Sequence, residues 1–248
     1  METVCCKNCG NEFSGNFCPE CGQKAKTSKI DIKYLREEAK YTLFHLNNGF
    51  FYTTKELFTR PGHATREFVE GKRVRHYKPI LFLFVLAGLY GFLLNAININ
   101  ALQVVTPQGK EYEAVHDAMH WMARHYSLAE LLFLPFTALA SWLAFRVWQY
   151  NYFEHLVINA YGAGLRLAIQ IIVFPLSVLA AGTVFSFVVS GIITIISFLT
   201  TGWLFAQFFK DKPLDKVILR LLLLVFYTII MTMAFGLVYA IFLIMSTR

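Results

Sequence analysis

The amino-acid sequence predicts an all-α polytopic membrane protein with about five transmembrane helices and a small N-terminal zinc ribbon. Of its 248 residues, 56% are hydrophobic and only 16% are charged, a composition more apolar than a soluble domain of this size needs. All five cysteines lie between Cys5 and Cys21. Composition and spacing together divide the chain into a ribbon at residues 1–27, cytoplasmic amphipathic or interfacial helices at 28–78, and a transmembrane bundle at 79–248.

The N-terminal segment contains two CxxCG motifs, and these predict one metal site. Four thiolates satisfy the closed tetrahedral shell that structural zinc prefers, whereas a redox dithiol favours a single CxxC motif on a βαβ unit. The glycine after each pair allows the chain to turn so that backbone N–H groups point at sulfur. Cys5 is either a spare thiol or an occasional substitute for its neighbour. The predicted ligands of a structural Zn²⁺ are Cys6, Cys9, Cys18 and Cys21.

The segment between the ribbon and the first apolar run is amphipathic and basic. Apolar and charged residues alternate at helical spacing over 28–46. Two further helices are expected at 50–59 and about 64–70, with a break at Pro61-Gly62. More than half of the 23 Lys and Arg residues precede Pro79. Because this basic segment leads directly into a span, we expect it to meet anionic lipid headgroups and not nucleic acid.

Five apolar segments are long enough to cross a membrane, since about 20 apolar residues span the hydrocarbon core as a helix. The third and fourth are divided at Ala181-Gly182, because no charged residue lies between Arg166 and Lys210. A single crossing or a re-entrant turn within 166–209 stays open as an alternative. The predicted spans are 79–98, 128–148, 155–180, 183–209 and 217–245.

The distribution of Lys and Arg around these spans predicts their orientation. With the N-terminus in the cytoplasm, six basic residues fall in inner loops or inner halves of spans, from Arg146 to Arg220. Outer segments then contain only Lys110, Arg124 and Arg248. The asymmetry favours a cytoplasmic N-terminus and an extracytoplasmic C-terminus.

Other polar patterns are weaker. His116 and His120 lie four apart, with Glu113 three residues earlier, but a solvated helix face is favoured over a metal site. Hydroxyl residues recur along the fourth span, including Ser190 and Thr194. Such a stripe favours close helix packing over a water path. No acid lies in the middle of a span, which counts against coupled transporters, and no enzyme fingerprint is present.

The two CxxCG motifs are followed by the stretch T-T-K-E-L-F-T-R-P-G-H-A-T-R-E-F-V-E-G-K-R-V-R-H-Y-K-P-I. This combination resembles an uncharacterised bacterial family of zinc-ribbon multi-pass membrane proteins that contain a domain of unknown function. The resemblance covers about the first 100 residues. It implies a fold and a location in the bacterial inner (cytoplasmic) membrane, and no substrate or reaction. The basic residues of this stretch would either anchor it at the membrane or form a phosphate cradle for anionic lipid or nucleotide. They are Arg60, Arg66, Lys72, Arg73 and Arg75.

These patterns favour a non-enzymatic membrane scaffold or adaptor that engages a cytosolic protein partner through its ribbon and amphipathic helices. A homo-oligomer in the lipid bilayer is compatible with the small-residue faces. The alternative is an oligomeric channel, transporter or membrane-permeabilising effector, with the hydroxyl stripe of the fourth span lining its path.

Overall fold

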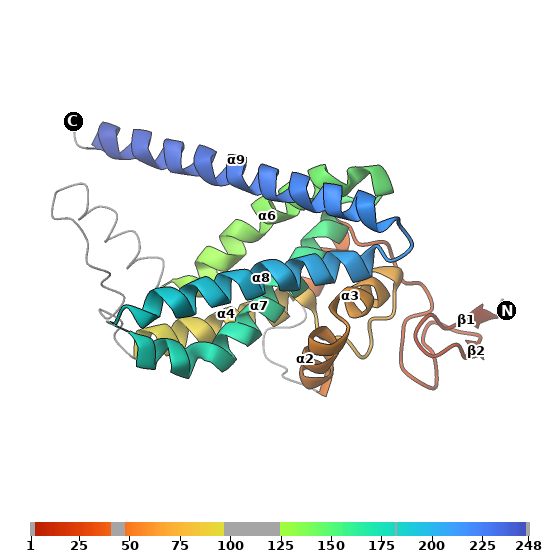
Figure 1. Ribbon diagram of the computed structural model, residues 1–248. Helices are drawn as coiled ribbons and strands as arrows, with labels where there is room; N and C mark the ends of the chain where they lie inside the picture. The colour runs from red at the N-terminus through yellow and green to blue at the C-terminus, as the bar shows by residue number, and fades with distance from the viewer. Residues whose placement is uncertain (1–2, 41–47, 97–124, 182, 247–248) are drawn as a thin grey trace.

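The computed structural model describes residues 3–40, 48–96, 125–181 and 183–246. A small module with one two-stranded antiparallel sheet precedes a set of helices (Figure 1). Val4 pairs with Phe13 and Cys5 with Glu12 in that sheet. The elements are β1 Val4–Cys5, β2 Glu12–Phe13, α1 Ile32–Lys40, α2 Asn48–Thr59, α3 Pro61–Glu70, α4 Pro79–Ala96, α6 Tyr126–Phe145, the 3₁₀ turn η2 Arg146–Trp148, α7 Tyr152–Ala180, α8 Phe185–Phe208 and α9 Leu214–Ser246.

Within the described residues, five helices are long and apolar enough to cross a membrane. They are α4, α6 with η2, α7, α8, and α9 over at least Leu214–Ala234. Because α7 ends at Ala180 and α8 begins at Phe185, the long apolar stretch forms two helices, as its division at residues 181–182 predicts. The multi-pass helical fold is therefore confirmed. The segment with Glu113, His116 and His120 lies outside the described residues.

Helix α7 lies at the centre of the helical part. It contacts α4, α6 and α8, and also α2 and α3. Asn151 caps its N-terminus: the Asn151 side chain accepts a hydrogen bond from the Glu154 N–H at 2.8 Å, and the Asn151 N–H donates to Glu154 Oε2 at 2.7 Å. This reciprocal box satisfies two N–H groups that a helix start otherwise leaves unpaired. Gly164 lets α4 approach, because a Cβ there would lie 2.6 Å from Phe82 Cδ1.

The short helix α3 packs against α8. Its first residues, Pro61 and Gly62, are buried in this contact and do not form a turn at the surface. Pro61 is its first residue, a position where proline has no hydrogen bond to lose. A Cβ on Gly62 would lie 2.3 Å from both Leu204 O and Phe208 N, so the two backbones touch. The Gly62 N–H also donates to Gln207 Oε1 at 3.1 Å. Because α2 ends at Thr59 and α3 begins at Pro61, the predicted break between two helices is confirmed, but Pro61-Gly62 begins the second helix instead of preceding it.

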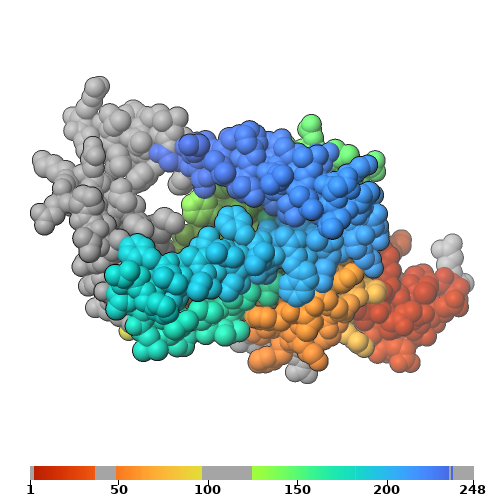
Figure 2. Space-filling view, viewed as in Figure 1, coloured from red at the N-terminus to blue at the C-terminus, as the bar shows by residue number. Residues whose placement is uncertain are grey.

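The cysteine-containing module and the far part of α9 lie toward opposite ends of the molecule (Figure 1). At the end near the module, α3 and the α8–α9 turn lie close together in the space-filling view (Figure 2). In the same view, a gap separates α8 from α9 in the parts of the two helices that lie farther from the module.

Candidate metal centre

The two CxxCG motifs form two turns with the same hydrogen bonds. In the first, the Gly10 N–H donates to Cys6 O at 2.8 Å and the Cys6 N–H to Asn11 O at 2.9 Å. In the second, the Gly22 N–H donates to Cys18 O and the Cys18 N–H to Gln23 O, both at 2.8 Å. Gly10 and Gly22 have φ values of +80° and +72°, in the left-handed region that glycine adopts at low cost. These angles confirm the sharp turn predicted at both glycines.

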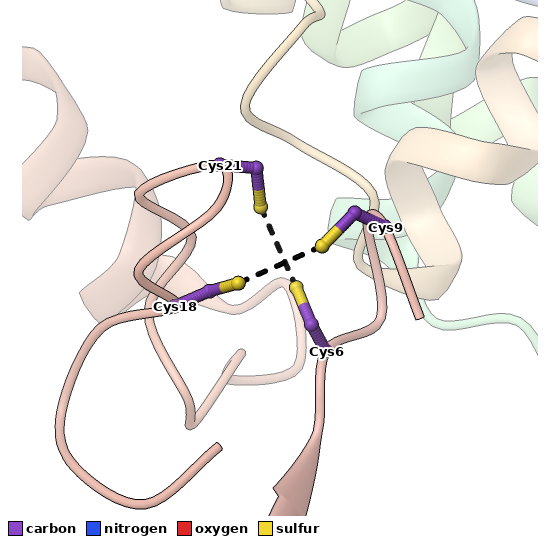
Figure 3. Close-up of side chains that lie close together, drawn as sticks. All are labelled: Cys6, Cys9, Cys18 and Cys21. Carbon is purple, nitrogen blue, oxygen red and sulfur yellow. Dashed lines mark hydrogen bonds between the residues drawn. The ribbon is translucent and has the colours of Figure 1, made fainter. Parts of the chain in front are cut away.

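The four cysteines predicted as ligands point their sulfurs at a common centre (Figure 3). Cys6 Sγ lies 3.5 Å from Cys21 Sγ, and Cys9 Sγ lies 3.6 Å from Cys18 Sγ. All four sulfurs lie within 4.8 Å of one another. A regular tetrahedron with metal–sulfur bonds of about 2.3 Å requires sulfurs about 3.8 Å apart. The cluster can therefore hold one metal ion with four sulfur ligands.

Cys5 is not part of this cluster. It is the last residue of β1, whereas Cys6 lies just beyond the strand and begins the first CxxCG turn. Its exposed thiol lies 3.5 Å from Gly10 O, whereas Cys6 is only 5% exposed. The structure thus distinguishes the two adjacent cysteines, which the sequence left open.

The surroundings of Cys6 favour its thiolate. Burial opposes ionisation, but the backbone N–H groups of Cys9 and Asn8 and the neighbouring thiols outweigh it and lower the pKa of Cys6 to about 6. At Cys9 the N–H of Asn11 favours the thiolate, but desolvation and the other thiols raise the pKa to about 12. One thiolate in the cluster thus disfavours a second. A bound cation would remove this conflict, because its charge stabilises all four thiolates together.

The module is joined to the helical part through Gln23, which directly follows the second CxxCG motif. This side chain is only 3% exposed. Its Nε2 donates to Gly71 O, and its Oε1 accepts from the Arg73 N–H at 3.3 Å. Gly71 ends α3 with φ +114°, and a Cβ there would lie 3.0 Å from Lys7 Cδ and Thr27 Oγ1. The loop after α3 therefore fits directly against the module.

Arg73 holds the linker that follows the module against α1 and α3. Its Nη2 donates to Ser28 O at 3.0 Å and its Nε to Phe68 O at 3.2 Å. The guanidinium carbon lies 4.4 Å from the centre of the Tyr34 ring, a cation–π distance. Tyr34 belongs to α1, so one side chain connects the linker, α1 and α3.

The other basic residues of the predicted phosphate cradle are spread over the surface of α3 and its flanks. Arg60 Nη1 lies 3.1 Å from Glu67 Oε1, and Lys72 Nζ lies 3.6 Å from the same oxygen. Arg66 pairs with Glu70 at 2.7 Å and with Asp211 at 2.5 Å. Arg75 is exposed. Arg60, Arg66 and Lys72 therefore have carboxylate partners within the chain, and contact of these residues with lipid or phosphate stays a prediction.

The ion pairs around Glu67 affect the titration of two groups. Burial opposes ionisation of Glu67, but Arg60, together with Lys72 and His76, lowers the pKa of this carboxyl below its usual value. His76 lies 3.6 Å from Glu67 and is 7% exposed. Burial lowers the pKa of His76 despite the nearby carboxylate, so its neutral form is favoured.

A second polar contact lies inside the helical bundle, at Arg166. It is the middle residue of α7, about 21 Å along the helix at 1.5 Å per residue. Its Nη1 lies 3.4 Å from Thr201 Oγ1 of α8. Glu130 and Tyr126 of α6 interact electrostatically with it. A Cβ on Gly162, one turn earlier, would lie 3.5 Å from Nη1, an ordinary contact distance, so the guanidinium lies close to this turn of its own helix. Arg166 therefore interacts with two neighbouring spans besides its own. In the sequence, its charge predicts only the orientation of the spans.

One part of this arrangement is similar to a known protein family. Residues 47–91 match the family described as Protein of unknown function (DUF3667). No curated protein and no solved structure matches the chain. The matched segment contains α2, α3, the loop that contacts the cysteine module, and most of α4. Similarity is thus concentrated where the module meets the bundle.

Proposed function

We propose that this chain is a membrane scaffold or adaptor that presents a structural zinc module at one end of a multi-pass bundle. The observation that carries the proposal is the attachment of the module by Gln23 to Gly71 and Arg73. That contact gives the module a defined position relative to α3, and α3 in turn touches α8. A module held in this way offers a partner a surface of fixed orientation at the membrane.

Zinc is the metal we assign to the four cysteines, because four thiolates in a closed shell are typical of structural zinc sites. Such a shell leaves no position for a substrate or an activated water molecule. The ion would therefore stabilise the module instead of supplying catalysis. In small domains of this kind, metal binding provides much of the folding free energy, on the order of 10 kcal/mol.

The surface available for a cytosolic protein partner is the loop between the two CxxCG motifs. Phe17 lies there with 58% of its surface exposed, whereas Phe13 in β2 is buried in the module. An exposed aromatic side chain on a small rigid support is a common anchor in protein interfaces. Phe17 therefore supports a protein partner more directly than the basic residues of α3, which form ion pairs.

We further propose that the module faces the cytoplasm across the bacterial inner membrane and that the C-terminus lies outside. The distribution of Lys and Arg supports this orientation. Reporter fusions at Lys110 and Arg248 should both give extracytoplasmic signals. A cytoplasmic signal at Arg248 would contradict five crossings.

A channel or permeabilising effector is the second candidate, and one observation favours it. Ser190 and Thr194 are exposed in the single chain, so no other helix of the described chain covers this part of the hydroxyl stripe. In an oligomer these residues could line a path. In the scaffold proposal the same residues form a seam between copies.

Metal analysis and liposome flux together test the proposal. Protein purified without chelators should contain one zinc per chain and should give no ion or dye flux above empty liposomes. Replacing Cys18 and Cys21 with Ser should abolish zinc binding and expose the module to protease while the spans remain inserted. Absence of zinc would overturn the metal assignment, and specific flux by the wild-type protein would favour the second candidate over a scaffold.

A further inference from the structure

A pocket of about 330 Å³ lies at the module-facing end of the bundle. It is formed where α3, the connection between α6 and α7, and the connection between α8 and α9 meet the linker after the module. Its walls include Lys29 from the linker, Arg66 from α3 and Lys212 from the α8–α9 connection. Three cationic side chains from distant parts of the sequence thus share one cavity.

The acids of this pocket are engaged with other groups. Asp211 lies 2.5 Å from Arg66, and Glu154 accepts a hydrogen bond from the Asn151 N–H in the helix cap. Within the described residues, neither Lys29 nor Lys212 has a carboxylate within 4.0 Å. The two ammonium groups therefore line the cavity without a direct ion pair, although Asp211, which pairs with Arg66, also attracts Lys212 at longer range.

Aromatic side chains provide the other wall of the pocket. Trp148 and Phe209 have ring centroids 4.5 Å apart, and Tyr150 lies beside Phe209 at 5.6 Å. Trp148 is the last residue of the α6 span, and Tyr150 and Phe209 lie just beyond the ends of the α6 and α8 spans, where Trp and Tyr prefer the boundary between hydrocarbon and headgroups. The cavity is thus placed at headgroup depth, and its volume is at the small end of the range for ligand pockets, about 300–1,000 Å³.

We propose that this pocket binds a phosphate group, with Lys29 and Lys212 as its principal contacts and Arg66 as a third cation. Ammonium groups act as strong point charges toward phosphate, and Lys29 and Lys212 are both exposed, so each can reach a phosphate at the mouth of the cavity. Of the predicted phosphate-cradle residues, only Arg66 takes part. Because Lys29 directly follows the module, a bound phosphate would also join the linker to the bundle. The site does not depend on the metal or on the scaffold proposal.

The test uses full-length protein in neutral detergent micelles, with native mass spectrometry to count retained lipids. The wild-type protein should retain one phosphatidylglycerol in preference to phosphatidylcholine, whose phosphate charge is offset by choline. Replacing Lys29 and Lys212 with Gln should weaken retention by about tenfold or more, because each lysine makes a charge-assisted contact. The matched control replaces Lys26 and Lys216, which are exposed but do not line the pocket. It should bind within about twofold of wild type.

A variant with the opposite expected effect guards against misfolding as an explanation. Asp211→Asn removes the carboxylate that competes for Arg66 and should tighten phosphatidylglycerol retention several-fold. Millimolar inorganic phosphate added alone identifies the source: displacement of lipid assigns the free anion, and unchanged retention assigns the lipid headgroup. Equal retention by wild type and the Lys29/Lys212 variant, or no preference for phosphatidylglycerol together with no effect of phosphate, would overturn the proposal.

Discussion

The two ends of the helical bundle differ in how their helices are covered. At the module-facing end, the first half of α7 is buried from Glu154 to Leu165, apart from Asn159, and α3 touches α8 at Gly62. At the far end, apolar side chains at the start of α8 such as Phe187 and Val188 are 59% and 50% exposed. Gly191 has no atom within 4 Å of an added Cβ. One end is thus packed within the chain, while the other requires lipid or a second copy to cover it.

This difference teaches that similar small-residue patterns have different roles at the two ends. Gly62 and Gly164 are needed because other atoms occupy the space of a side chain. Gly88, Gly191 and Gly236 have open space around them. In lipid, small residues favour helix association only where a partner helix approaches. The following predictions use this contrast, starting with the largest expected effect.

Replacing Gly62 with Leu should have the largest effect on stability. A side chain there would meet the backbone of α8 at 2.3 Å, so α3 and α8 must separate. Overpacking typically costs about 1–3 kcal/mol, and we expect at least the upper value because backbone atoms cannot move aside. Thermal unfolding in detergent measures the change. Gly191→Leu is the matched control and should shift stability little, so an equal loss in both variants would contradict the contrast between the two ends.

Replacing Gln23 with Ala should release the module from the bundle without unfolding either part. The change leaves Gly71 O and the Arg73 N–H without their buried partner, at a cost of about 1–3 kcal/mol. Hydrogen exchange at Arg73 and protease cleavage in residues 27–32 should both increase. Lys24→Ala, at an exposed neighbouring position, serves as control. Unchanged protection in the Gln23 variant would show that other contacts hold the module.

Replacing Ser190 and Thr194 with Leu tests the far end. The Thr194 hydroxyl donates to Ser190 O of its own helix, and both side chains are exposed. The stability of the isolated chain should therefore change by less than about 0.5 kcal/mol. If copies associate through this face, oligomer size should fall, because each interhelical hydrogen bond lost is worth about 0.6 kcal/mol. Light scattering in detergent measures this. Loss of wild-type flux with unchanged assembly would instead indicate a pore.

The smallest effect should be a pH dependence confined to the packed end. Burial lowers the pKa of His76, so an unfolded chain binds a proton at this residue more readily than the folded chain. Stability should therefore fall as the pH drops below about 6.5, the ordinary histidine value. Glu67 adds a loss in the same direction at lower pH, since its pKa is also lowered. His76→Phe should make the free energy of unfolding, measured with urea, depend less on pH between about pH 7.5 and about pH 5.5. If the variant keeps the pH dependence of the wild-type protein, His76 is not the residue that causes it.

The features determined by the sequence alone are those that depend on local spacing. Two CxxCG motifs specify two glycine turns and four converging sulfurs, because each ligand pair is closed by hydrogen bonds within five residues. Apolar length predicts five spans, since a helix satisfies its own backbone in lipid regardless of its neighbours. The separation of α7 from α8 also follows from length.

Tertiary structure decided the features that depend on contacts between distant residues. Gly62 resembles a turn glycine until Leu204 and Phe208, more than 140 positions later, occupy the space beside it. Gln23 belongs to no recognisable sequence motif. It joins the module to the bundle only because the loop after α3 presents a carbonyl oxygen and an N–H group to its side chain. The basic stretch suggests one anion site, yet Glu67 and Asp211 neutralise part of it from within the chain. Periodicity encodes which face of a helix is apolar, but the partner of each side chain is set by which helices meet in space.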